Sequence, residues 1–168
     1  TDKYNKDEIN FLTCDNPYFQ LIHKSINRCT SIEEEYDLNE HNSKDIKWST
    51  LKYINDNLKN YKDKKKLYDF NDIVDLTIRK KDDPDFPTFK AVFIDEAQDL
   101  SPLQWKLFDV LKTKTEDMYL AGDDDQAIFA WAGADVDRFI QEPAKERVLM
   151  YSKRISLRVQ EESQKPIE

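Results

Sequence analysis

Three short apolar runs, each bordered by polar residues, limit the fold of this chain more than any other feature. The runs are Phe89–Ile94, Met118–Ala121 and Val148–Tyr151. The first is followed by Asp95 and the second by Gly122-Asp123, and helical patterns such as residues 103–111 lie between them. Short apolar runs alternating with helices are typical of a parallel α/β sheet, in which ligands bind beyond the carboxyl ends of the strands. The residues that follow the runs are therefore the first candidates for a site.

The first half of the chain is predicted to be mostly helical. Trp48, Leu51, Ile54 and Leu58 recur at helical spacing, and a looser stripe extends from Ile9 to Ile26. Either Asp69 or Asn71 is expected to cap the helix that follows. In the second half, Ser101 and Pro102 are the expected cap and first residue of the helix over 103–111. The lysines of residues 62–66 are either a solvated helix end or a phosphate contact.

Composition excludes several classes of protein. The 168 residues include 26 Lys or Arg and 34 Asp or Glu, so the net charge of −8 excludes a bulk basic surface for nucleic acid but not a local groove. No apolar run approaches the ~20 residues of a membrane span. Cys14 and Cys29 lack the pairing of a zinc site and are interpreted as free thiols in a reducing compartment. The two glycines, Gly122 and Gly133, are expected where the backbone needs unusual angles or close approach.

Asp95-Glu96 is the first candidate for chemistry, because an apolar run delivers two adjacent carboxylates at its carboxyl end. One reason for such a pair is a hydrated Mg²⁺ held by the first carboxylate and a water activated by the second. The alternative is an acidic helix start, where the helix dipole favours Asp and Glu. Both interpretations stay open on this segment alone.

A second candidate lies in residues 120–135, which begin Leu-Ala-Gly-Asp-Asp-Asp-Gln. The three aspartates do not have the spacing of an EF-hand calcium loop. Gln126 carries an amide that can donate to a phosphate oxygen. Phe129 and Trp131 could offer ring faces to nucleic-acid bases, or could simply be core residues.

Four blocks of the sequence together resemble superfamily 1 DNA helicases of the UvrD/Rep type. Asp95-Glu96-Ala97-Gln98-Asp99 resembles the Walker B segment of that family (motif II), and residues 122–134 resemble motif III. Asp69-Phe70-Asn71-Asp72 resembles the element found upstream of that Walker B segment, and residues 149–154 resemble the start of motif IV. The resemblance covers residues 69–160 and implies a partial RecA-like P-loop NTPase fold, an α/β parallel sheet with a mostly helical N-terminal insertion. It divides the chain into a 1B-like insertion, residues 1–68, and the later half of the first motor domain, residues 69–168.

The resemblance implies ATP and Mg²⁺ as cofactors and assigns four residues to them. Asp95 matches the aspartate that holds Mg²⁺, and Glu96 matches the general base for the attacking water. Gln126 matches the glutamine that senses the γ-phosphate, and Arg154 matches the arginine that stabilises its developing charge. Trp131, and less closely Phe129, match aromatic residues that stack on single-stranded DNA.

The implied activity is ATP-driven movement along single-stranded DNA, 3′ to 5′, with unwinding of duplex DNA, in the cytoplasm of a bacterial or phage-infected cell or in a eukaryotic nucleus. Three features depart from the family pattern: Ala132 replaces an expected arginine, Lys153 replaces a tyrosine, and no Gly-x-x-x-x-Gly-Lys-Ser/Thr loop occurs. We therefore expect an internal fragment of a longer, enzymatically active protein, itself inactive. The alternatives are a non-catalytic interaction module derived from a helicase and a metal-dependent nuclease built on Asp95, Glu96 and the Asp123–Asp125 run.

Overall fold

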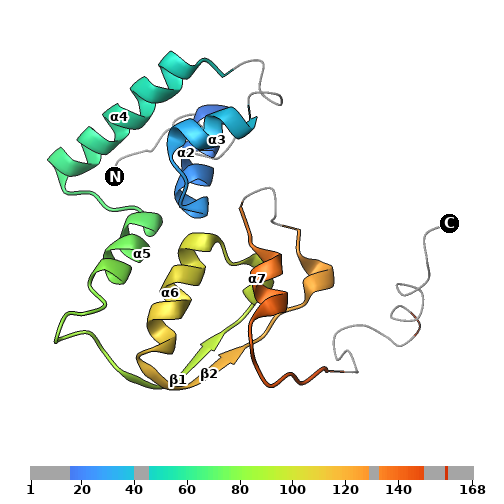
Figure 1. Ribbon diagram of the computed structural model, residues 1–168. Coiled ribbons are helices and arrows are strands. Elements are labelled where there is room, and N and C mark those ends of the chain that lie inside the picture. Colours follow the sequence, from blue (N-terminus) through green and yellow to red (C-terminus); the bar gives the residue numbers. More distant parts are fainter. Residues whose placement is uncertain (1–15, 40–45, 129–132, 150–157, 159–168) are drawn as a thin grey trace, which may run out of the picture.

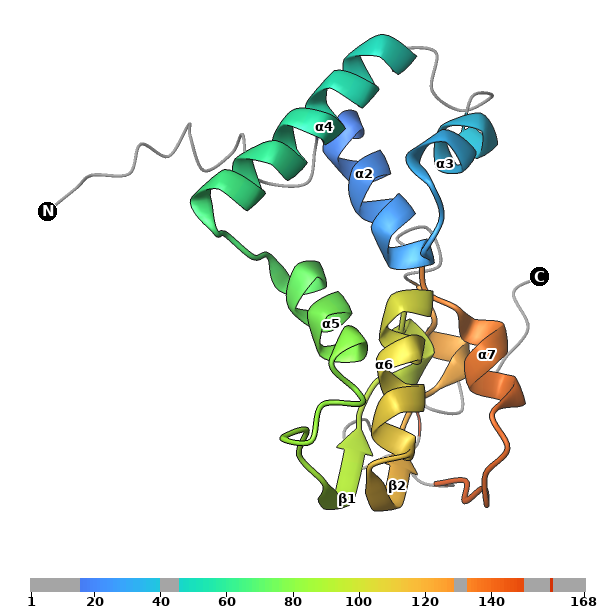
Figure 2. The ribbon, with the colours of Figure 1, turned by 60° about the vertical axis from the view of Figure 1, so that its left-hand side comes forward.

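The computed structural model describes residues 16–39, 46–128, 133–149 and 158. The elements, in chain order, are α2 (Pro17–Arg28), α3 (Ile32–Asn39), α4 (Trp48–Lys65), α5 (Phe70–Arg79), β1 (Phe89–Ile94), η1 (Ala97–Asp99), α6 (Pro102–Lys112), β2 (Thr115–Leu120), η2 (Asp124–Gln126) and α7 (Val136–Gln141). The helices α2, α3 and α4 lie above an α/β part that contains the sheet with α5, α6 and α7 (Figures 1 and 2). None of the described helices combines the length and apolar character that crossing a membrane requires.

The upper helices pack around their own apolar cluster. Leu21, Ile22 and Leu51 are buried there, and Trp48 and Leu58 pack against them. The apolar stripe predicted over 48–58 is therefore the buried face of α4. α2 begins at Pro17 after the Asn16 cap. The looser stripe predicted from Ile9 is confirmed only in its second part, because residues 1–15 lie outside the described residues.

A buried carboxylate joins α2 to α3. Glu35 has no exposed surface, and its carboxylate lies 3.2 Å from Lys24 Nζ and 3.5 Å from Arg28 Nη1. Thr30 Oγ1 and Asn39 Nδ2 also donate to this carboxylate, over 3.3 and 2.9 Å. A buried charge is tolerated where it is paired and hydrogen-bonded, as it is here.

Lys62, one of the lysines of residues 62–66, has a structural role at the junction between α4 and α5. Asp69 caps α5 and forms a capping box with Asp72, and Lys62 Nζ pairs with both carboxylates. Partial burial acts to lower the pKa of Lys62, but its hydrogen bonds to the two aspartates and their charges outweigh burial and raise it. Lys62 is thus neither a fully solvated residue nor a free phosphate contact, whereas residues 64–66 are exposed. Of the two caps considered, Asp69 is the one used.

The lower part contains a two-stranded parallel sheet, in which Ala91 pairs with Asp117 and Ile94 with Leu120. α6 begins as predicted, with Ser101 as its cap and Pro102 as its first residue, and it buries its apolar side chains in this part. The other face of the sheet is open within the described residues: Phe93 and Tyr119 are 75% and 50% exposed and stack with centroids 4.7 Å apart.

Two of the three predicted strands are confirmed, and the third is not found in the half of its run that the structure describes. β2 begins at Thr115, three residues before the apolar run. No strand forms at Val148 and Leu149, which are 66% and 84% exposed, while Met150 and Tyr151 lie outside the described residues. A strand needs a neighbour for its backbone groups, and within the described ranges no strand lies beside Val148 and Leu149. The predicted third strand is therefore not found at Val148 and Leu149, the part of the run that the structure describes.

Candidate functional site

The candidate site lies at the carboxyl edge of the sheet, where β1 and β2 end side by side. Beyond both strands the backbones remain paired: the Ala121 N–H donates to Ile94 O over 2.8 Å, and the Ala97 N–H donates to Ala121 O over 2.9 Å. The parallel pairing therefore brings the Asp95-Glu96 segment against the Gly122-Asp123 segment, as the sequence predicted. Such an edge is where open α/β sheets bind their ligands.

Asp95 and Glu96 both present exposed side chains at this edge. The Glu96 N–H donates to Asp95 Oδ1 over 3.0 Å, and Glu96 has left-handed backbone angles, φ 53° and ψ 43°. Glu96 precedes the three-residue turn η1, but its side chain makes no capping hydrogen bond. The interpretation of the pair as an acidic helix start is therefore not supported, because the next α-helix begins later and uses Ser101 as its cap.

Gln126 lies on the neighbouring turn, η2. Its amide Nε2 donates to Asp123 Oδ2, and the Asp123 carboxylate also accepts from the Asp125 N–H over 3.1 Å. Gln126 is exposed, and it follows β2 at the same edge of the sheet as Asp95 and Glu96. The structure thus brings together the three described residues that sequence analysis assigned to the nucleotide.

The carboxylates present fit a magnesium ion only in part. Within the described ranges no group of three or more His, Cys, Asp or Glu side chains could hold a metal by itself. Mg²⁺ is commonly held by one or two carboxylates together with substrate phosphates, so Asp95 suits that role as a single protein ligand. The same finding gives no support to the nuclease interpretation, which needs a protein-built metal cluster at Asp95, Glu96 and Asp123–Asp125.

Three predicted site residues, Phe129, Trp131 and Arg154, lie outside the described residues. Their assignment to DNA and to the γ-phosphate stays a prediction. Both glycines do occupy the special positions expected of them. A Cβ on Gly122 would lie 2.6 Å from Gln98 Oε1, and Gly133 has φ +101° with Arg28 beside it.

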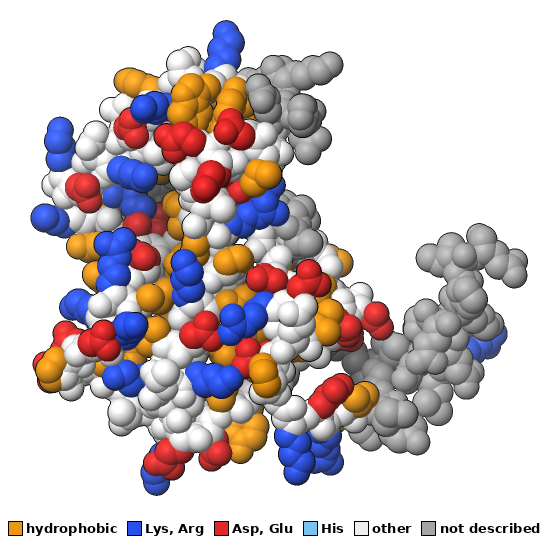
Figure 3. Space-filling view, in the orientation of Figure 1, with side chains coloured by type: hydrophobic (Ala, Val, Ile, Leu, Met, Phe, Trp, Pro, Cys, Tyr) orange, Lys and Arg blue, Asp and Glu red, His pale blue; other side chains and the backbone are white. Residues whose placement is uncertain are grey.

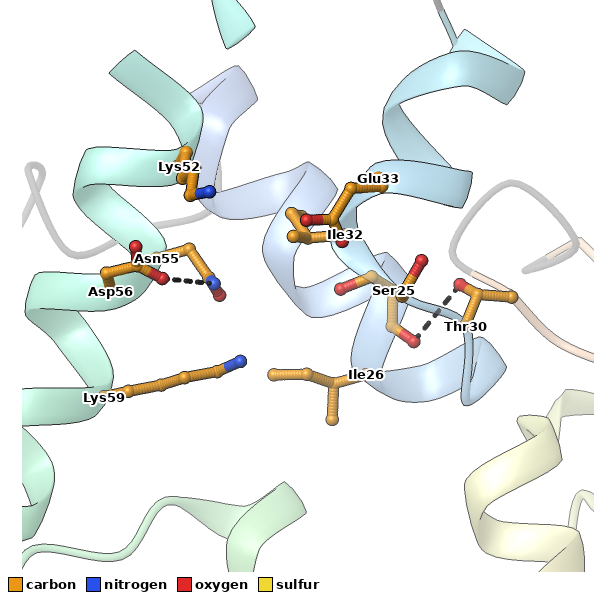
Figure 4. A pocket seen from close by; sticks show the side chains of 10 residues that line it. Ser25, Ile26, Thr30, Ile32, Glu33, Lys52, Asn55, Asp56 and Lys59 are labelled. Carbon is orange, nitrogen blue, oxygen red and sulfur yellow. Dashed lines mark hydrogen bonds between the residues drawn. The ribbon is translucent and has the colours of Figure 1, made fainter. Parts of the chain in front are cut away.

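Sequence analysis did not single out Gln98, although it is 1% exposed and lies between the two turns. In the sequence Gln98 is distinguished only as an amide among carboxylates, and this pattern does not predict that its side chain is buried. A separate hollow of about 400 Å³ lies between α2, α3 and α4, lined by residues such as Ser25, Asn55 and Lys59 (Figure 4). None of the predicted site residues lines it.

Charge on the described surface is mixed. Figure 3 shows Lys and Arg side chains interspersed with Asp and Glu over the face in view, in keeping with the net charge of −8. The exclusion of a bulk basic surface therefore agrees with this face of the molecule.

Comparison with known proteins establishes the family. Residues 2–146 match the model of the UvrD/REP helicase N-terminal domain, so the chain belongs to the UvrD/REP helicase family. The resemblance read from the four sequence blocks is thereby confirmed.

Individual relatives agree with this assignment. The chain is 37% identical over 109 residues to the RecBCD enzyme subunit RecB of Buchnera aphidicola subsp. Acyrthosiphon pisum, which covers 60% of this chain and 9% of that protein. It is 42% identical over 50 residues to the ATP-dependent DNA helicase Rep of Buchnera aphidicola subsp. Baizongia pistaciae, covering 30% of this chain and 8% of Rep. A probable DNA helicase II homolog of Mycoplasma genitalium is 33% identical over 121 residues, covering 65% of this chain and 17% of that protein.

These matches span less than a fifth of each of those relatives. No solved structure gives a significant match to this chain.

Proposed function

We propose that this chain is part of the first motor domain of an ATP-dependent DNA helicase that moves along single-stranded DNA and unwinds duplex DNA. The observation that carries the proposal is the meeting of two turns, with Asp95-Glu96 on one and Asp123 and Gln126 on the other, at the carboxyl edge of a parallel sheet. The family match over residues 2–146 supports the same function.

Each described residue has a chemical task in this proposal. Asp95 offers one carboxylate oxygen to a magnesium ion, which supplies charge neutralisation on the nucleotide phosphates when it is bound. Glu96 accepts the proton of the attacking water, and Gln126 donates its amide hydrogen to a phosphate oxygen. Phosphoryl transfer depends mainly on positioning and electrostatics, so a fixed arrangement of these side chains is sufficient for their part in it.

The finer parts of the proposal concern DNA and the division of the chain. Residues 1–68 form the helical insertion and residues 69–168 the later half of a RecA-like domain, and translocation runs 3′ to 5′. Arg154 supplies positive charge to the γ-phosphate, and Trp131 with Phe129 stacks on bases. The protein acts where the genome lies, in the cytoplasm of a bacterium or in the nucleus of a eukaryote.

The test is ATP hydrolysis stimulated by single-stranded DNA, measured on the complete gene product that contains these residues. Glu96→Gln is expected to abolish turnover while nucleotide binding is retained, because the substitution removes a base but little volume. Glu116→Gln, an exposed carboxylate at the start of β2, is the matched control and is expected to leave turnover unchanged. Normal turnover in Glu96→Gln would refute the proposed mechanism. Displacement of a labelled strand from duplexes with a 3′ or a 5′ tail tests the direction of movement.

A further inference from the structure

A single buried amide connects the two turns of the candidate site. Gln98 is 1% exposed, and its Nε2 donates to Glu96 Oε2 over 2.8 Å, with Asp99 Oδ2 at 3.5 Å. Its Oε1 accepts from the backbone N–H of Asp123 over 3.0 Å. Both ends of the amide are thus in use, as burial of a polar side chain requires. No other described side chain makes hydrogen bonds to both turns.

Gln98 lies in close contact with Gly122, a position at which a larger residue would not fit. A Cβ on Gly122 would lie 2.6 Å from Gln98 Oε1 and 2.7 Å from Phe139 Cζ of α7, so only glycine lets the β2 turn approach so closely. α7 is itself attached to α6 through Arg138 Nη2 and Asp109 Oδ1, 2.7 Å apart. The amide is therefore enclosed between the two turns and α7, and its position is defined by packing as well as by hydrogen bonds.

We infer that Gln98 is a positioning residue: it aims the Glu96 carboxylate and holds the Gly122-Asp123 turn in register with it. Asp123 in turn accepts a hydrogen bond from the Gln126 amide, so one chain of hydrogen bonds links the general base to the phosphate-sensing residue. This inference rests on the proposed function for its catalytic meaning. The local structural part, the hold on Asp123, does not depend on it.

The kinetic test compares two glutamines in the complete gene product. Gln98→Met keeps the volume and removes both hydrogen bonds, and kcat for ATP is expected to fall about 10- to 100-fold, the usual effect of losing a residue that orients a site group. KM for ATP is expected to stay within about twofold, because the interaction lost acts on the reacting water and not on nucleotide binding. Gln104→Met is the control: Gln104 also accepts from a backbone N–H, that of Ser101, but only to cap α6.

The second test reads the hydrogen bond directly, without nucleotide. Amide hydrogen exchange at Asp123 is expected to become about tenfold faster in Gln98→Met, the effect of losing one ordinary hydrogen bond. Gln98→Glu separates the two halves of the inference when its new carboxyl group is ionised, because the carboxylate keeps an oxygen for Asp123 but has no donor for Glu96. Both measurements are therefore repeated at raised pH, since burial and the neighbouring Glu96 favour protonation of that carboxyl group. In Gln98→Glu, exchange at Asp123 is expected to stay slow while kcat falls as far as in Gln98→Met. This variant also decides the question if Gln98→Met does not fold.

The outcomes distinguish the inference from the proposed function. Unchanged kcat in both Gln98 variants, in a protein whose turnover is lost in Glu96→Gln, would overturn the positioning role and leave the function standing. Unaltered exchange at Asp123 in Gln98→Met would overturn the structural half. Absence of ATP turnover in the unmodified gene product would instead refute the proposed function.

Discussion

Glu35 allows a sharp test of how the helical part is held together. Its carboxylate is fully buried, but the side chains of its two cationic partners, Lys24 and Arg28, are 22% and 35% exposed. Removing the acid and removing the bases are therefore unequal perturbations. Glu35→Gln leaves two cations that can regain water, whereas Lys24→Met with Arg28→Met leaves a buried carboxylate with only neutral donors.

The expected magnitudes follow from this asymmetry. Glu35→Gln keeps the shape and the acceptor oxygen, so its cost is the loss of charge-assisted hydrogen bonds to partly hydrated cations, about 1–2 kcal/mol. The double methionine variant leaves a charge buried and unpaired, which costs about 3–5 kcal/mol. In a chain of 150–250 residues 1 kcal/mol shifts Tm by about 2–4 °C, so the falls in Tm expected when the 168 residues are studied by themselves are about 2–8 °C and about 6–20 °C.

Far-UV circular dichroism during urea and thermal unfolding measures both variants, because α2, α3 and α4 contribute much of the helical signal. Glu33→Gln, an exposed carboxylate on the same helix, is the matched control and is expected to change the free energy of unfolding by less than about 0.5 kcal/mol. If the double methionine variant costs no more than Glu35→Gln, burial of the carboxylate is not what makes the network necessary, and the reasoning fails.

Further predictions concern the α4–α5 junction, Gly133 and the binding of DNA. Asp69→Ala is expected to lose about 1 kcal/mol or slightly more, the cost of an N-cap, in urea unfolding. Partial burial acts to raise the pKa of Asp69, but Lys62 lowers it below the ordinary value of 3.8. The ionised Asp69 carboxylate therefore stabilises the fold above that pH, and the stabilisation is lost as the pH falls. Asp69→Asn keeps the cap and should make stability depend less on pH in acid unfolding monitored by circular dichroism. The pKa of Lys62 is raised above its ordinary value of 10.5, so the stability that its charge contributes is present below that pH and is lost as the pH rises further. Lys62→Met should therefore make the free energy of unfolding depend less on pH in alkaline solution. Gly133→Ala should cost about 1–3 kcal/mol because φ is +101°, with a matching fall in Tm. Trp131→Ala should weaken binding of a labelled single-stranded oligonucleotide by about 1–3 kcal/mol, and unchanged affinity would remove it from the DNA site.

Helices and strands whose ends are marked by characteristic residues could be predicted from the sequence alone. α6 was predictable because Ser101 and Pro102 mark its start and an apolar stripe marks its buried face. β1 was predictable because an apolar run ends abruptly at Asp95. Val148–Leu149 shows the limit of this reasoning, since an apolar run becomes a strand only where another strand pairs with it.

The sequence predicted which strand ends form the candidate site, but it did not predict which side chains are buried there. Parallel pairing made it expected that Asp95 and Gln126 lie at one edge. Gln98 is buried against a segment 25 residues further along the chain, and Glu35 is buried where α2 and α3 pack together. In the sequence, an amide among carboxylates or a glutamate within a run of three is equally consistent with a solvated residue. Tertiary packing, which no local pattern encodes, decides these cases.

Glu96 has a left-handed backbone conformation that favours glycine, so stability and the proposed activity make different demands on this position. A non-glycine residue in this conformation costs roughly 1–2 kcal/mol, and glycine would relieve that cost while adding about 0.5–1 kcal/mol of unfolded-chain entropy. Glu96→Gly also removes the acceptor of the buried Gln98 Nε2, which costs about 1–3 kcal/mol, so relief of the backbone strain is expected to offset part of that loss. A screen for solubility or heat resistance would therefore register only the net change in stability and not the loss of the proposed general base, so an assay of function is needed to protect that position during engineering.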